Sequence, residues 1–599
     1  MVCERLLLTS SNNTVRIWHV NPPVSVPMTD LAELTLRSQS LGALPVLQHV
    51  LDRLGLDGLL EQYVPHLDRR CRIRPATALG ILLRNILLGR RPIYGLQEWA
   101  QPFLPSLLGL EPDQVGGLND DRVGRALDRL FNADRASLMT TIVVRAIQAF
   151  DLQLDQFHND STSITFSGAY AQATGRKIRG RQAVSITHGH NKDHRPDLKQ
   201  LLWILTVSAD GSVPVHYRLC DGNTNDDPTH IQTWEALCRL TGRTDFMYVA
   251  DCKLCTRANM DHIAHGKGRF ITVLPGSRKE DAWFRGYIQD HDLPWEEVIR
   301  RPSSHGADRP DDLWRVVPAP NRSAEGYRII WVWSQSLAYQ HEQSRLAALQ
   351  KAFDGIQELQ AKLQGPHCRT RDRAAVEEAV ARILAQGGVS RWAEAEVTET
   401  NDSRFRQESR GHPGANTRYV KVERTRFAVA WKPKPAAIAY DARSDGMYPL
   451  VTNCDDLPAE EVLLKYKYQP NLEKRHEQLK TVYAVAPAFL KDEGRIEALL
   501  LLYFLALLIQ ALLERQVRAA MKGANLDVLP LYPEDRECKA PTTNRILEVF
   551  ESIQRHDLMD GDNVYKCFEP KLTPLQEDLL RLLEVPRDLY GLAAVGMDS

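Results

Sequence analysis

The sequence predicts an α/β protein in which a helical N-terminal domain precedes a core that a long insertion interrupts. Three observations indicate this. Apolar residues at helical spacing dominate residues 40–150, and short apolar or alternating runs typical of strands dominate residues 151–275. A charged, mixed segment then separates these strands from a further apolar helix near the C-terminus. At 599 residues the chain is long enough for several domains.

The first 37 residues resemble no part of a packed domain. Residues 14–19 form one possible strand, and residues 21–27 are rich in proline, as in a linker. We expect residues 1–37 to be a leader that is either disordered or a non-native start upstream of Met28.

Residues 38–150 are predicted to form a helical domain. The expected helices are around Leu47–Leu54, Ala76–Leu88, Leu96–Phe103 and Asn119–Phe131. Arg122, Arg125 and Arg129 follow at steps of three and four residues, so they share one side of the last helix. This pattern fits a DNA-binding helix and equally an ordinary helix with solvated arginines, and both interpretations stay open.

Residues 151–275 are predicted to be the first part of the α/β core. An Asp-Gly turn at residues 210–211 predicts a hairpin. The expected strands are Gln156–Phe166, Ala183–Thr187, Leu201–Val207, Val213–Leu219, Asp245–Asp251 and Phe270–Leu274, with helices at Pro228–Leu240 and Thr256–His265.

The remaining chain is predicted as an insertion (276–435), a second part of the core (436–525) and a helical tail (526–599). The insertion is expected to contain strands 313–317 and 327–333 and two antiparallel helices, 346–363 and 374–384. In the second core part we expect strands over 436–454, a helix that begins near Pro470, and a long helix over 495–521. The apolar run 498–509 is too short to span a bilayer and indicates a buried core helix.

Three acidic residues form the candidate site. Asp160 lies in a predicted strand, Asp251 ends another, and Glu473 lies on the helix after Pro470. Tyr466, Gln469, Glu473 and Lys480 step by three, four and seven residues, which places them near one helix face with the carboxylate and the ammonium roughly 10 Å apart. Such a face is most often only solvated. Together with two strand aspartates it makes a set of oxygen ligands suited to Mg²⁺.

These motifs resemble those of bacterial insertion-sequence DDE transposases. The similarity is to the subgroup with a long insertion between the second Asp and the Glu and with a Tyr-x2-Arg-x3-Glu-x6-Lys signature. Here that signature is Tyr466, Gln469, Glu473 and Lys480, with Gln in the place of the usual Arg. The runs 158–163, 189–197 and 221–225 also match, and the resemblance covers about residues 40–520.

The resemblance implies a ribonuclease-H-like core and a definite chemistry. In that fold the first and fourth strands are neighbours, which brings Asp160 and Asp251 together. Asp160, Asp251 and Glu473 would be the catalytic residues and would hold two Mg²⁺ ions, for which Mn²⁺ can substitute. In relatives an aromatic residue of the insertion stacks on an extruded base; Trp331 and Trp333 are the candidates here, although a core role suits them as well.

Positive charge is clustered in a chain whose net charge is only −1. Residues 404–434 carry nine Lys or Arg against two acidic residues, and residues 176–199 carry seven against two. Beside a phosphoryl-transfer site, such clusters favour contact with DNA phosphates. The expected DNA-binding residues are Tyr466, Lys480, Arg475, Lys192, Arg195, Arg424 and Arg426.

The resemblance also predicts partners and location. These are double-stranded DNA in the form of terminal inverted repeats and target DNA, a homodimer on that DNA, no membrane, and the bacterial cytoplasm at the nucleoid. Two rival functions are a metal-dependent nuclease of the same fold and an inactive DNA-binding relative. The ten cysteines lack disulfide or zinc spacing, so neither Cys252-x2-Cys255 nor His188, His190 and His194 is expected to bind metal.

Overall fold

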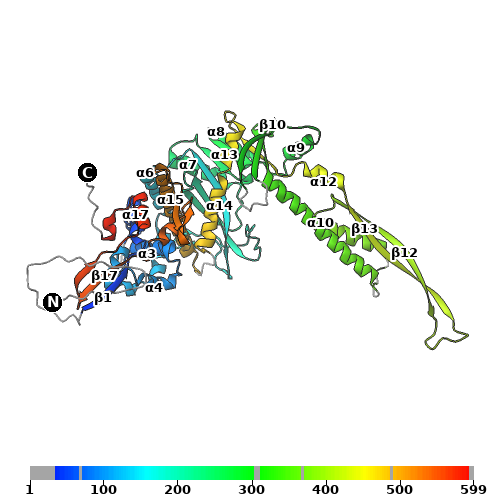
Figure 1. Ribbon diagram of the computed structural model, residues 1–599, viewed down its shortest axis with the longest axis horizontal. Coiled ribbons are helices and arrows are strands. Elements are labelled where there is room, and N and C mark those ends of the chain that lie inside the picture. The colour runs from blue at the N-terminus through cyan, green and yellow to red at the C-terminus, as the bar shows by residue number, and fades with distance from the viewer. Residues whose placement is uncertain are drawn as a thin grey trace, which may run out of the picture. The chain divides into compact units, whose positions relative to one another are not determined.

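The computed structural model shows a mixed α/β protein and describes residues 34–65, 71–302, 311–365, 368, 370, 372–485 and 490–591 (Figure 1). The chain divides into two compact units. The first contains the chain up to Phe270 and again from Lys467, and the second is Ile271–Tyr466. The predicted insertion, residues 276–435, lies inside the second unit.

The N-terminal part of the first unit is helical, as the apolar spacing predicts. Its helices are α1 (Leu44–Leu54), α2 (Leu56–Tyr63), α3 (Pro75–Leu88), α4 (Leu96–Ala100), α5 (Asp120–Asn132) and α6 (Arg135–Phe150). Pro45 lies in the first turn of α1, where its missing N–H costs nothing, and Gly55 ends that helix with a φ of 59°. The side chain of Asn119 caps α5 by accepting from the backbone N–H of Arg122. Helices α2 and α6 were not predicted from the sequence.

The expected leader is wrong for its last four residues. β1 (Leu34–Ser40) pairs antiparallel with β17 (Gln554–Asp560), which pairs with β18 (Asn563–Phe568). The tail predicted as helical therefore contains strands, including β15 (Leu529–Tyr532) and β16 (Arg536–Cys538), beside α16 (Thr543–Glu548) and α17 (Pro574–Leu582). The partners of β1 lie more than 500 residues away in sequence, so local patterns could not reveal them. Residues 14–19, the other strand expected in the leader, lie outside the described residues.

A mixed sheet forms the centre of the first unit. Its strand order is β6 (Pro214–Asp221), β5 (Lys199–Ser208), β2 (Gln156–Phe166) and β7 (Met247–Ala250). β5 is antiparallel to both neighbours, whereas β7 runs parallel to β2. The predicted adjacency of the first and fourth strands is therefore confirmed. Helices α7 (Thr229–Thr241) and α8 (Arg257–His265) flank β7 in sequence.

The predicted strand Ala183–Thr187 is wrong. A small hairpin, β3 (Lys177–Ile178) with β4 (Arg181–Gln182), ends just before this segment, which itself contains only isolated bridges such as Thr187 to Gln200. Both edges of β5 are already occupied, by β2 and β6. The β5–β6 register begins only at Leu201, so Thr187 pairs with Gln200 just outside it.

Helix α15 (Glu493–Gly523) is the main core helix of the first unit. By length and composition it could cross a membrane, but 89% of its most apolar window is buried inside the protein. Phe504 stacks on Tyr217 of β6 with ring centroids 4.7 Å apart. The expected buried helix is therefore confirmed, and it supports the β6 side of the sheet.

The second unit contains an antiparallel sheet. The order is β8 (Arg269–Val273, of which the last three residues belong to this unit), β14 (Met447–Thr452), β11 (Arg328–Ser334), β10 (Asp312–Arg322) and β9 (Glu296–Arg301), and its short helices are α9 (Lys279–Asp290), α12 (Pro435–Ala442) and α13 (Ala459–Tyr466). The strand expected over the first part of 436–454 is wrong, because α12 occupies 435–442. Pro435 at its start and four alanines within it favour a helix.

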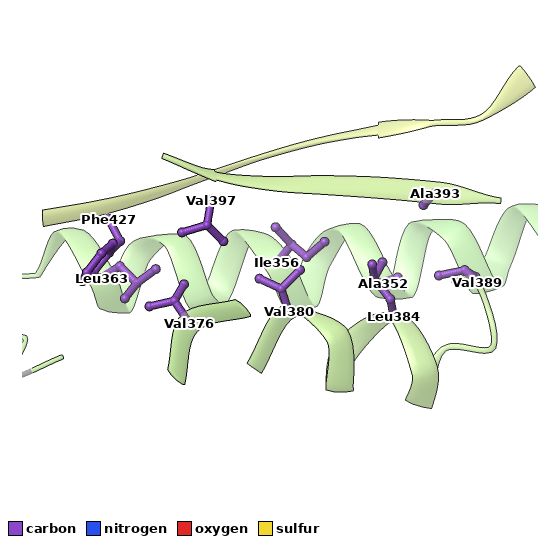
Figure 2. Packing of buried hydrophobic residues seen from close by; sticks show 10 residues of the cluster. All are labelled: Ala352, Ile356, Leu363, Val376, Val380, Leu384, Val389, Ala393, Val397 and Phe427. Atoms are coloured by element: carbon purple, nitrogen blue, oxygen red, sulfur yellow. The ribbon is translucent and has the colours of Figure 1, made fainter. Parts of the chain in front are cut away.

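Two helices and a long β-ribbon complete the second unit. Helix α10 (Gln335–Gln364) packs against α11 (Arg373–Gln386), as predicted for an antiparallel pair. β12 (Ala393–Gln407) and β13 (Tyr419–Pro433) form a two-stranded antiparallel ribbon. Figure 2 shows Val397 and Phe427 of the ribbon meeting Ile356, Leu363 and Val376 of the helices in a common core. The sequence analysis recognised the basic charge of this segment but not its ribbon form.

Candidate active site

Asp160 and Asp251 lie side by side at one place in the sheet. Asn159 of β2 is in register with Ala250 of β7, so the next residue on each parallel strand is an aspartate. The Oδ1 atom of Asp160 accepts from the N–H of Ser161 at 2.7 Å. The side chain of Asp251 caps the short turn Cys252–Leu254 by accepting from the N–H of Lys253 at 3.0 Å. These bonds orient both carboxylates.

Helix α14 (Gln469–Glu477) packs on β2 and carries Glu473, whose carboxylate interacts electrostatically with Asp160. The Oε1 atom of Gln469 accepts from Nδ1 of the buried His158 at 2.7 Å, and its Nε2 donates to the carbonyl oxygen of Asn159 at 3.3 Å. Gln469 is 5% exposed, so it fastens the helix to the strand and does not face an open surface. Glu473 lies one helical turn further along α14.

The three carboxylates interact electrostatically. Burial raises the pKa of Asp160, against the opposing effect of a lysine ammonium. Burial and then the charge of Asp160 raise the pKa of Asp251, and the same two causes raise the pKa of Glu473. Burial is the first cause of each shift, and a cation bound among the carboxylates would lower their pKa values.

The donor set fits a divalent cation of the Mg²⁺ type. Within the described residues, no three His, Cys, Asp or Glu side chains are gathered closely enough to form a ready-made metal cage. Mg²⁺ does not require one, since it usually takes one or two carboxylates and completes its shell with water and substrate oxygens. The oriented pair Asp160 and Asp251 supplies such ligands. The same finding gives no support to zinc at Cys252 and Cys255 in this part of the chain.

Lys192 and Asp226 extend the cluster. The Lys192 Nζ atom lies 3.6 Å from Asp160 Oδ1 and 3.5 Å from Asp226 Oδ2, and it donates to the hydroxyl of Ser161 at 2.7 Å. Ser161 Oγ in turn donates to Asp226 Oδ2 at 2.6 Å. Lys192, expected to contact DNA, thus places its ammonium among the carboxylates. Asp226 was not predicted as a site residue, although the matching run 221–225 ends one residue before it.

Two further side chains approach the cluster from α14 and the π-helical turn after it (Gln478–Val482). His476 Nε2 lies 3.8 Å from Asp160 Oδ2, and burial lowers the pKa of His476 to about 3. Lys480 Nζ lies 2.6 Å from Asp193 Oδ1 and keeps 25% of its side chain exposed. A contact between Lys480 and a DNA phosphate stays a prediction. It requires the Lys480 ammonium to leave Asp193 and pair with the phosphate instead.

Two residues that were expected to contact DNA, Arg475 and Trp331, are buried. Arg475 is 3% exposed and pairs with Glu514 at 2.9 Å. Trp331 is 1% exposed and stacks on Phe284 with ring centroids 3.9 Å apart. Both side chains are enclosed by the fold in this structure, and their contacts with DNA stay predictions.

The other expected DNA contacts stay predictions. Trp333 is half-buried, with the guanidinium of Arg315 5.2 Å from its ring centre. Arg195 is exposed and pairs with Asp197. Arg424 and Arg426 lie on the ribbon of the second unit. Tyr466 belongs to the same unit, where it is the last residue of α13 and its ring lies near that of Tyr448.

The arginines of α5 line a cavity of about 200 Å³ in the first unit. Arg122, Arg125 and Arg129 border it together with residues 71, 73 and 75, and Arg122 donates to the Cys71 sulfur at 2.7 Å. The arrangement leaves both interpretations of these arginines open, because such a cleft can hold an anion or only water.

His158 predicts a pH dependence of stability. It is fully buried, its Nε2 contacts the Gln156 amide at 2.7 Å, and burial lowers its pKa from 6.5 to about 4. Between pH 6.5 and 4 the unfolded chain binds a proton that the folded chain does not, so the unfolding free energy should fall with falling pH, by up to about 1.4 kcal/mol per pH unit. Urea unfolding on both sides of pH 6 checks this. His158→Gln should show a smaller fall, and an equal fall would assign the effect to other groups.

Comparisons with known proteins give limited similarity. Residues 36–144 match the model of a family described as a domain of unknown function (DUF4277). No curated protein matches the chain. Among solved structures, the piggyBac transposase in its synaptic complex with hairpin DNA is similar at 9% identity and a TM-score of 0.37, over 84% of this chain and 79% of that one. A similarity this distant does not establish a shared function.

Proposed function

We propose that the protein is the transposase of a bacterial insertion sequence, which binds the terminal inverted repeats and cleaves and joins DNA strands by metal-dependent phosphoryl transfer. The observation that carries the proposal is the meeting of Asp160, Asp251 and the Glu473 helix at neighbouring strands of one mixed sheet. Those carboxylates belong to the motifs whose order resembles DDE transposases. The ribonuclease-H-like core is part of the same proposal, as are a homodimer on DNA and a place at the bacterial nucleoid.

The chain's own residues supply binding and orientation. Asp160 and Asp251 would hold divalent cations, with Glu473 completing the set; when bound, such ions activate a water or a DNA 3′-hydroxyl and stabilise the leaving oxygen. The bond from Ser161 and the cap at Asp251 keep the carboxylates aimed at one place. Lys192 neutralises part of the charge, which lowers the cost of holding the carboxylates together before substrate enters.

The test of the proposal is Mg²⁺-dependent cleavage of a duplex that carries the element's terminal repeat. Glu473→Gln should lower the cleavage rate by about 100-fold, since a charge that stabilises the reacting phosphate is lost, while DNA affinity changes little. Glu477→Gln is the matched control, because it makes the same change at an exposed position of the same helix. Equal cleavage by wild type and Glu473→Gln would mean that α14 is not the catalytic helix.

The rival functions separate in the same assay. Products in which the cleaved end is joined to target DNA distinguish a transposase from a nuclease. Binding without cleavage by the wild type would favour the inactive relative. The departure at Gln469 no longer favours that rival, because Gln469 has a structural role between α14 and β2.

A further inference from the structure

The ribbon of the second unit contains a long part that no other described element covers. Its base packs on α10 and α11 through Ala393, Val397 and Phe427. Beyond this base, almost every residue of 398–423 is exposed, on both faces of the ribbon. In Figure 1 β12 and β13 continue past the end of α10. The ten paired residues 398–407 span about 33 Å at the usual rise of a strand.

The uncovered part concentrates positive charge. Residues 400–426 carry Arg404, Arg406, Arg410, Arg418, Lys421, Arg424 and Arg426 against Asp402, Glu408 and Glu423, a net charge of +4 (7 − 3). The whole chain has a net charge of −1. An excess of basic residues has no evident role in a ribbon that contacts only water, whereas it would attract an anionic partner.

The register of β12 with β13 shows which side chains share each face of the ribbon. On one face Arg404 lies opposite Val422 and Arg406 lies opposite Val420, so two guanidinium groups stand beside exposed valines. Neither arginine forms an ion pair with a described residue. On the other face the exposed Phe405 lies opposite Lys421, and Tyr419 follows on the same side.

We propose that the ribbon from Thr398 to Ala428 is an arm that lies along the major groove of duplex DNA and binds its phosphates without sequence preference. The major groove admits a two-stranded β-ribbon, and about 33 Å is close to one turn of the double helix. A second copy of the ribbon is a poorer occupant, because residues 398–428, which include Glu399, carry a net charge of +3 (7 − 4) and two such arms repel each other. The inference rests on the proposed function, which requires that duplex DNA be held.

The experiment measures DNA affinity without cleavage. The full-length protein is titrated in EDTA against a labelled duplex of arbitrary sequence, about 30 base pairs long, at several salt concentrations between about 50 and 200 mM. The variant is Arg404→Gln/Arg406→Gln/Lys421→Gln. The matched control is Lys351→Gln/Arg373→Gln/Arg382→Gln, which removes the same charge from exposed positions of α10 and α11.

The ribbon variant should bind at least about tenfold more weakly, and its slope of log affinity against log salt should be smaller by about 2.7, or 0.9 for each lost phosphate contact. The control should bind like the wild type. Equal weakening by both variants, or none by the ribbon variant, overturns the proposal. So does a ribbon variant that changes only the sedimentation of the protein alone, since the ribbon would then be a protein interface. Because EDTA prevents cleavage, failure here is distinct from failure of the Glu473→Gln test.

Discussion

Asp160→Asn is expected to lower the rate of DNA cleavage by about 10³-fold while it raises the melting temperature of the protein. The first effect follows from the central place of Asp160, which adjoins Asp251 and interacts with Glu473, Lys192 and Asp226. The second follows from its pKa. A variant that is more stable and inactive would show that the carboxylate is kept for chemistry and not for folding.

The sign of the stability effect can be worked out. Burial raises the pKa of Asp160 above its value in the unfolded chain, so the folded state prefers the neutral acid. The free energy of unfolding therefore decreases as the pH rises from the pKa of Asp160 in the unfolded chain to its raised pKa in the folded chain, and the decrease persists at higher pH. Asparagine keeps the shape and removes the charge. The hydrogen bond from the Ser161 N–H can persist with the amide oxygen.

Thermal unfolding with and without Mg²⁺ checks both parts. A cation that binds the folded wild type should raise its melting temperature, and the rise should be smaller in Asp160→Asn. Asp578→Asn is the control, because the Asp578 side chain is 51% exposed and pairs with Arg581 on α17. Wild-type cleavage by Asp160→Asn, or a melting temperature several degrees lower than that of the wild type, would contradict this account.

Features with a local signal could be predicted from the sequence. The strand of Asp160, the Asp-Gly hairpin and the helix after Pro470 each have a pattern within about 10 residues, and all three are found in the structure. The pairing of β1 with β17 has no such local signal, because the two strands are far apart in the sequence and form their hydrogen bonds only in the folded chain. The ribbon was missed for a related reason. Its exposed half has no apolar alternation to mark it as strand.

The candidate site shows the same limit. Its carboxylates could be predicted because two aspartates on predicted strands and a glutamate on a predicted helix together make a set of oxygen ligands suited to Mg²⁺. Asp226 was missed because only its contacts with Ser161 of β2 and with Lys192 bring it to the cluster. Arg475 was assigned to the surface because charged residues are rarely buried unless they are paired. Its partner, Glu514, lies 39 residues away on α15, so the sequence shows no local reason to pair them.

Arg475→Met is expected to destabilise the protein by about 3–5 kcal/mol. The Arg475 guanidinium donates to Glu514 at 2.9 Å and to the carbonyl oxygens of Ser212 and Gly211 at 3.1 Å each. It thereby joins α14 to α15 and to the β5–β6 turn. Methionine fills much of the space but leaves the Glu514 carboxylate, 2% exposed, without its closest cation. Urea unfolding measures the loss, and Lys474→Met, at an exposed position of the same helix, is the control.

The double variant Arg475→Met/Glu514→Leu separates a structural role from a DNA contact. If the pair serves only to fasten the helix, removing both charges should recover much of the lost stability, since no buried charge remains unpaired. Recovery should be incomplete, because the Thr543 N–H and the Gln510 amide also donate to Glu514 and would lose their acceptor. DNA affinity should follow stability in both variants. A stable Arg475→Met protein with weakened DNA binding would instead return Arg475 to the DNA-contacting surface and imply that α14 moves away from α15 when DNA binds.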